Sequence, residues 1–146
     1  MKTTVTLLLL VLLSSVDAIG QSVLGKWKTI DDNTNKARSI VEIYEMDGKV
    51  FGKVEKLFRE PDEDPDPICE ECDDSDDRKN QKVIGMEILR DMEKEGDEYE
   101  DGTILDPENG KVYDCKIWVD PDHPNKLNVR GYVAFFFRTQ VWVRYE

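Results

Sequence analysis

The sequence is short of the residues that most catalytic and metal sites require. It has three cysteines and one histidine. It also lacks the Gly-x-Ser-x-Gly, HExxH and phosphate-binding Gly-rich patterns of common enzyme classes. His123 lies in the turn-like segment PDHPN, where an exposed histidine needs no function. The residues therefore give no reason to expect an enzyme, a cofactor or a bound metal.

Long apolar runs are equally scarce. The run at residues 5–13 follows Lys2 and is followed by small residues, which is the pattern of a secretory signal peptide. It is too short to span a bilayer, and no later run is long enough. We expect cleavage after Ala18, with Gly20 as the alternative. Removing 18 of the 146 residues leaves 128, enough for one domain with one core, placed at 21–146.

Basic residues are missing from one segment. The formal net charge is -12, and residues 60–77 alone hold eleven acids and no base. Nucleic acid is not an expected partner, because phosphate binding needs clustered Lys and Arg. Calcium is a weaker interpretation of these acids, since DEDPDP and DDSDD lack the glycine and final Glu of an EF-hand loop. We expect a solvated acidic loop at 59–81, whose residues 60–77 could dock a basic partner in a salt-dependent way.

Two of the cysteines lie inside this loop at CxxC spacing. An exported protein meets an oxidising environment, which favours a local Cys69–Cys72 disulfide that stiffens a surface loop. A zinc site made with Cys115 and His123 is one alternative, although the spacing matches no familiar finger. A redox centre is the other, although the surrounding acids would raise the thiol pKa. Cys115 shares one face of 111–120 with apolar residues, so we expect it to be buried and free.

The rest of the chain alternates between strand-like segments and turns. Asp47-Gly48, between two such segments, is a strong hairpin signal. Residues 82–92 are ambiguous, because their apolar residues fit both helical and strand spacing, and we assign them to a strand. The short, regular intervals predict an all-β protein, an antiparallel up-and-down barrel of about eight strands. The expected strands are 24–30, 37–46, 49–58, 82–92, 97–106, 111–120, 126–133 and 138–146.

The last two expected strands each carry Arg and aromatic residues on one face and aliphatic residues on the other. Either the aliphatic faces line the core and the Arg/aromatic faces meet water, or the Arg/aromatic faces line a cavity. The segment VAFFF between these strands predicts a barrel corner packed on both sides, with an exposed membrane or partner patch as the alternative.

Several segments carry a resemblance. GKW at 25–27 resembles the Gly-x-Trp that opens lipocalin-like barrels, where an Arg of the last strand packs across the Trp; Arg144 is the first candidate and Arg138 the second. GKWKTID, GKVFGKVEKLF, DPDPICEEC, VIGMEILRDM, ILDPENGKVYDCKIWV, LNVRGYV and RTQVWVR together resemble the domain-of-unknown-function family 2147, with a loop similar to the Bacteroidetes branch. One departure is the glycine-free VAFFF between RGY and RTQ.

The resemblance implies a lipocalin-like (calycin-like) barrel in the periplasm or medium of a Gram-negative bacterium, with no established activity. An eight-stranded barrel can hold one small ligand. Our leading hypothesis is a monomeric, non-enzymatic binder of a small, partly apolar or amphipathic, anionic molecule. The alternative is an assembly module with a solid barrel and an acidic docking loop. The expected ligand-binding residues are Trp27, Arg130, Tyr132, Arg138, Gln140, Trp142 and Arg144.

Overall fold

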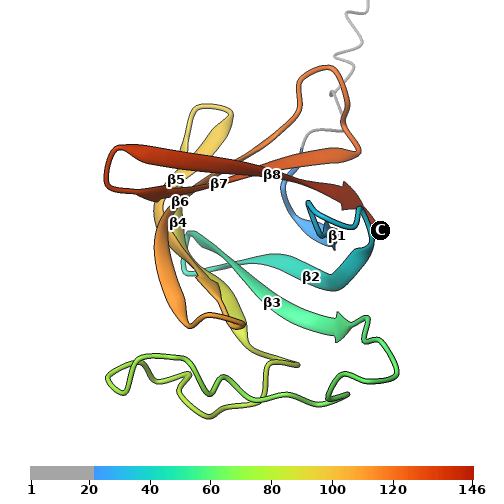
Figure 1. Cartoon of the computed structure of the whole chain (residues 1–146). Helices are drawn as coiled ribbons and strands as arrows, with labels where there is room; N and C mark the ends of the chain where they lie inside the picture. Colours follow the sequence, from blue (N-terminus) through green and yellow to red (C-terminus); the bar gives the residue numbers. More distant parts are fainter. Residues whose placement is uncertain (1–21) are drawn as a thin grey trace, which may run out of the picture.

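Alternating side chains and short polar turns build eight consecutive antiparallel strands. The computed structural model describes residues 22–146, so the expected leader at 1–18 and its cleavage site lie outside the described residues. Each strand pairs with the next, and β8 returns to β1, which closes the barrel (Figure 1). This confirms the expected up-and-down barrel. The strands are β1 (Gly25–Ile30), β2 (Ala37–Met46), β3 (Lys49–Leu57), β4 (Glu87–Glu95), β5 (Glu98–Asp106), β6 (Lys111–Val119), β7 (Lys126–Val133) and β8 (Phe136–Arg144).

One strand begins later than the sequence predicts. The expected strand at 82–92 is replaced by β4, which starts at Glu87. Gly85 has a φ of 91°, a conformation that interrupts an extended strand. The amide of Val83 donates to the carbonyl of Pro67, and that of Met86 donates to Val83, so this stretch turns back onto the preceding loop. Residues 82–86 therefore belong to the β3–β4 connection, which runs from 58 to 86.

The barrel interior is filled with apolar side chains. Trp27 is 0% exposed and Trp142 is 2% exposed, and both belong to one continuous core with Val, Ile, Leu and Met residues of strands β2 to β7. Cys115 is buried in the same core, as expected, and burial raises the pKa of its thiol to about 12. A thiol in this state is not a nucleophile at neutral pH. Within residues 22–146 no helix has the length and apolarity needed to cross a membrane.

The connections fall at two ends of the barrel, because neighbouring strands run in opposite directions. One end, here called the mouth, carries the β1–β2, β3–β4, β5–β6 and β7–β8 connections. The other end, here called the base, carries the first described residues and the C-terminus. The long β3–β4 connection, residues 58–86, is here called the cap; it runs along the lower edge of the barrel in Figure 1.

Candidate functional site

The base of the barrel is closed by Arg144 and Trp27. The Arg144 guanidinium carbon lies 3.9 Å from the centre of the Trp27 ring. Its two terminal nitrogens donate to the carbonyls of Leu24 (2.9 Å) and Ser22 (2.8 Å). Burial lowers the pKa of Arg144. The arginine that packs across Trp27 is therefore Arg144, the first candidate from the sequence, and this pair ties the N-terminal segment over the base.

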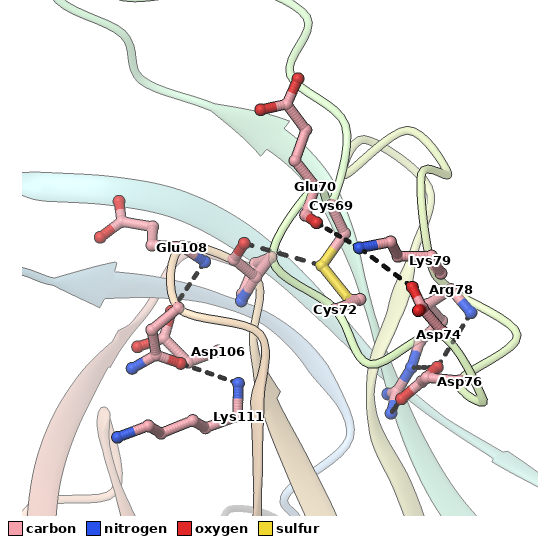
Figure 2. The surroundings of a disulfide bond; sticks show 12 residues. Cys69, Glu70, Cys72, Asp74, Asp76, Arg78, Lys79, Asp106, Glu108 and Lys111 are labelled. Atoms are coloured by element: carbon pink, nitrogen blue, oxygen red, sulfur yellow. Dashed lines mark hydrogen bonds and ion pairs between the residues drawn. A yellow bond between two sulfur atoms is a disulfide. The ribbon is translucent and has the colours of Figure 1, made fainter.

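The cap is anchored over the mouth by the disulfide that the sequence predicts. Cys69 and Cys72 are joined, and both are buried in the barrel core. The Cys69 sulfur lies 3.7 Å from the carbonyl oxygen of Pro107 in the β5–β6 turn (Figure 2). A Cβ added at Gly110, where φ is 72°, would lie 1.8 Å from the carbonyl oxygen of Glu71. The expectation of a staple in a surface loop is thus corrected in one respect: the disulfide is a buried contact between the cap and the barrel.

Six of the eleven acids at 60–77 form ion pairs within the chain. Buried Arg78 binds the Asp76 carboxylate through two nitrogens (2.9 and 2.8 Å) and donates a third bond to the carbonyl of Glu87. These bonds hold the pKa of Asp76 well below its usual range. Arg90 likewise binds Asp77 and lowers its pKa. These two arginines come from the cap itself and from β4, so the acidic segment is held against the barrel.

Lys79 adds to this network. Its ammonium group donates to the carbonyl of Glu70 (2.6 Å) and lies 3.5 Å from Asp74 (Figure 2). Within residues 22–146 no group of three or more His, Cys, Asp or Glu side chains is arranged to hold a metal ion. The disulfide also takes two of the thiols that the alternative zinc site would need.

The ladder between β1 and β8 is short. Their ladder consists of the pairs Trp27↔Arg144 and Lys28↔Val143, whereas β7 and β8 stay paired along their whole length. Beyond this point, side chains of β8 contact Asp32, which follows β1 in the β1–β2 connection. Arg138 forms an ion pair with Asp32, and the Gln140 amide donates to the same carboxylate at 3.4 Å. We call this region, residues 29–32 opposite 138–142, the seam; it lies between the end of this ladder and the mouth.

Strand register places Arg138, Gln140 and Trp142 on the inner face of the barrel. Gln140 is opposite Val129 and Trp142 is opposite Leu127, and both partners are buried. Residues directly opposite in an antiparallel pair share a face. Trp142 is therefore the innermost of the three, behind the side-chain bridge to Asp32.

Two features of the inner face beside the seam suit ligand binding: a hydrogen-bond donor without a partner among the described residues, and a space next to Gly131. The indole Nε1 of Trp142 is buried and has no hydrogen-bond partner among the residues that the structure describes. Such a donor is rare in folded proteins, because it has lost water without gaining an acceptor. Gly131 is opposite Arg138, and a Cβ there would come no closer than 3.5 Å to Tyr113. The inner face next to Arg138 therefore has room for at least a further methyl group.

Arg130 and Tyr132 lie on the outer face instead. Arg130 is opposite Thr139 and donates to its hydroxyl at 2.8 Å, and Tyr132 is opposite Phe137. The Arg130 guanidinium stacks on the rings of Phe137 (4.2 Å) and Trp118 (5.0 Å). The structure thus divides the seven expected site residues into three groups. Trp27 and Arg144 close the base, Arg138, Gln140 and Trp142 line the seam, and Arg130 and Tyr132 face outward.

Sequence reasoning missed Asp32, which occurs in the turn-rich segment DDNTNK without a pattern that marks it. Two surface hollows, of about 410 and 350 Å³, lie elsewhere and are lined mainly by charged and polar residues. Neither is lined by Asp32, Arg138 or Trp142. The seam is therefore the place where expected site residues, a buried unpartnered donor and the end of the β1–β8 ladder come together.

Comparison with known proteins agrees with this architecture. A solved structure described as "Protein HP1028 from the human pathogen Helicobacter pylori belongs to the lipocalin family" superposes with a TM-score of 0.68 at 19% identity, covering 86% of this chain and 84% of that one. No curated protein matches the chain significantly. A family model described as "Uncharacterized protein conserved in bacteria" (DUF2147) matches residues 25–144. This chain, folded as a lipocalin-like barrel, belongs to that family.

Proposed function

We propose that this protein is an exported, non-enzymatic binding protein that holds a small, partly apolar molecule with a carboxylate end at the seam. The observation that carries the proposal is the buried, unpartnered Nε1 of Trp142, whose side chain lies on the inner face of β8. An acceptor atom of a ligand would satisfy this donor and recover the cost of its desolvation, about 1–3 kcal/mol.

The side chains in front of Trp142 favour an anionic end on the ligand. Arg138 and Gln140 both direct their donors to one carboxylate, that of Asp32. The Arg138 side chain is well exposed, so its ion pair with Asp32 contributes little stability and exchanges readily. A ligand carboxylate would take the place of the Asp32 carboxylate on the same donors. The apolar remainder of the ligand would lie along the inner face beside Gly131.

Access through the seam is consistent with the closed ends of the barrel. The cap and its disulfide cover part of the mouth, and Arg144 ties the N-terminal segment over the base. Between β1 and β8, by contrast, the ladder ends after Lys28↔Val143. Export agrees with the expected leader and with the disulfide, a bond that persists in oxidising compartments.

The proposal is tested by titrating the protein with decanoate, and with decanol as the matched ligand without a carboxylate. We expect decanoate to bind more tightly, and Arg138→Gln to weaken it by up to about fivefold, because an ion pair of an exposed side chain contributes about 0.2–1 kcal/mol. Asp32→Asn removes the competing carboxylate and should strengthen binding several-fold. The matched control is Arg130→Gln on the outer face, which should leave binding unchanged. Equal effects of Arg138→Gln and Arg130→Gln would refute the site.

Native mass spectrometry of the protein purified from its own host gives the natural ligand. We expect an adduct on the wild type that is lost from Arg138→Gln. Absence of any adduct, together with no binding of decanoate, would refute the proposal and leave a solid barrel.

The cap as a docking surface for a basic partner receives less support. Its acids Asp66, Asp76 and Asp77 already bind cations of the chain, Lys82, Arg78 and Arg90. The pair with Arg90 holds the cap to β4, and the pairs with Lys82 and Arg78 hold the cap together. Five acids at 60–77 form no ion pair among residues 22–146. Capture of a basic partner that disappears when residues 61–77 are deleted, with an unchanged thermal midpoint, would favour docking instead.

A further inference from the structure

The turn between β7 and β8 exposes a cluster of large apolar side chains. Phe135 is 99% exposed, Phe136 78% and Phe137 61%, and Val133 is exposed as well. We call residues 133–137 the tip. The sequence favoured a barrel corner packed on both sides, and the structure contradicts this: the segment is a turn at the mouth, with Ala134 at a φ of 50°. Four exposed apolar residues at one turn mark an interaction site.

The shape of the tip argues for a deformable partner. Val133 and Phe136 are the last pair of the β7–β8 ladder, and Ala134 and Phe135 form the turn between them. Because successive residues of a strand point to opposite faces, apolar side chains project on both sides of this hairpin end. The hairpin end lies at the left edge of the molecule in Figure 1, away from the cap. A convex end that is apolar on both sides is suited to insertion rather than to contact with a flat protein surface.

The residues behind the tip have the chemistry of a membrane interface. On the outer face, Phe137 is followed by Tyr132, Arg130 and Trp118, and the Arg130 guanidinium stacks between the rings of Phe137 and Trp118. Lys116 also approaches the Trp118 ring, at 5.8 Å. Tyr, Trp and Arg place an apolar body next to hydrocarbon and a polar end next to phosphate and water. From the end inward, the outer face changes from phenylalanine to amphipathic aromatic and cationic residues.

We propose that the tip inserts into the surface of a lipid bilayer, with Phe135 and Phe136 at the acyl boundary and Arg130, Tyr132 and Trp118 at the level of the headgroups. The protein then lies on the membrane and does not span it. Phe137, Tyr132 and Arg130 lie on the opposite face of the wall from Arg138 and Trp142, so this part of the surface is separate from the seam.

The distribution of charge on the protein determines whether it prefers neutral or anionic lipids. The chain carries a net charge of -12, and much of it lies in the cap. The cap follows β3, which is four strands from β7 in a ring of eight, so it lies on the opposite side of the mouth. Near the tip, Lys116 is paired with Glu98, and the hollow beside Tyr132 is also lined by Glu100, Asp101 and Asp114, so the local charge has no positive excess. Binding is therefore driven by the aromatic residues, and neutral lipids are preferred over anionic ones.

The test is flotation with vesicles of phosphatidylcholine, using protein recovered from the exported fraction. Wild type and variants share one N-terminus, so any contribution of residues 1–21 is the same in all of them. We expect Phe135→Ser to reduce the partition coefficient about tenfold and Phe135→Ser/Phe136→Ser about a hundredfold, because each exposed Phe loses its burial in the acyl boundary. The control is Met46→Ser, which removes an exposed apolar side chain at the base and should change nothing. Adding phosphatidylglycerol should not strengthen binding.

Three results would overturn the proposal. The first is wild-type protein that does not float with phosphatidylcholine. The second is a double serine variant that floats as well as wild type. The third is a wild-type dimer in gel filtration that the double variant dissociates, without vesicle binding, which would assign the tip to a contact between copies. Phe135 and Phe136 are too exposed for their loss to unfold the barrel, and circular dichroism of the variants checks this directly.

Discussion

Two buried tryptophans allow the unpartnered donor of Trp142 to be tested directly. The Nε1 of Trp27 donates to the carbonyl of Val23 at 2.8 Å, whereas the Nε1 of Trp142 has no partner among residues 22–146. Both side chains are at most 2% exposed. Replacing each with Phe removes the same atoms from equally buried positions, so the cost of lost packing is similar in the two variants. The difference in unfolding free energy between the two variants therefore reports mainly on whether the indole N–H has a hydrogen-bond partner.

The expected magnitudes follow from the hydrogen bonds. Trp27→Phe loses one hydrogen bond, which costs about 1 kcal/mol, and weakens the stacking with Arg144. Trp142→Phe removes a donor that was desolvated without compensation, which recovers about 1–3 kcal/mol. The Trp27 variant should therefore be less stable than the Trp142 variant by about 2–4 kcal/mol.

Urea unfolding of both variants, followed by far-ultraviolet circular dichroism, measures this difference. The protein is first refolded from denaturant, so that no ligand from the host remains bound. With a typical urea dependence of about 2 kcal/mol per molar for a chain of this size, the midpoints should differ by roughly 1–2 M. Equal midpoints would refute the reasoning, because they would mean that the Trp142 N–H is already satisfied in the ligand-free protein.

Three further predictions concern the cap. Reduction of the disulfide, or the variant Cys69→Ser/Cys72→Ser, should lower the unfolding free energy by about 2 kcal/mol, the estimate for a loop this short. A thiol titration of the denatured, unreduced protein should find one reactive thiol, and three would refute the disulfide. The bonds from Arg78 lower the pKa of Asp76, so this carboxylate adds stability above about pH 3.8 that is lost as the pH falls further. The urea midpoint should therefore fall less between pH 6 and pH 3 in Asp76→Asn than in the wild type. Equal falls in the two proteins would contradict this. Gly110→Ala should lower the unfolding free energy by about 1–3 kcal/mol and speed proteolysis of the cap, because the added Cβ would clash with the cap backbone and the residue has a positive φ. A urea midpoint and a cleavage rate equal to those of the wild type would contradict the contact.

Much of the fold could be predicted from the sequence, because strand pairing in this barrel is local. Alternation of apolar and polar residues located 37–46 and 126–133 at their observed bounds, and Asp47-Gly48 marked the β2–β3 hairpin. Each strand pairs with its neighbour in the chain, so the order of short strands and turns already implies the topology. The predicted Cys69–Cys72 bond is also local, since only two residues separate its partners.

The candidate site could be predicted only in part. The alternation in β7 and β8 showed that each has an Arg/aromatic face and an aliphatic face, and a period of two does not say which face is inside. The barrel turned the aliphatic face of β7 inward but the Arg/aromatic face of β8 inward, leaving Val141 and Val143 partly exposed. For this reason Arg130 and Arg138 lie on opposite sides of the wall, although the sequence suggested one surface.

The sequence by itself therefore determined the strands, their order, the acidic segment and the disulfide, because these depend on neighbours along the chain. Tertiary structure alone decided the features that depend on how the ends of the barrel meet. Closure joined β8 to β1 over two residue pairs and left Asp32 facing Arg138 across the seam. It also brought the disulfide into the core and left Phe135 exposed, because the positions of the cap and the tip are set by strands far away in the chain.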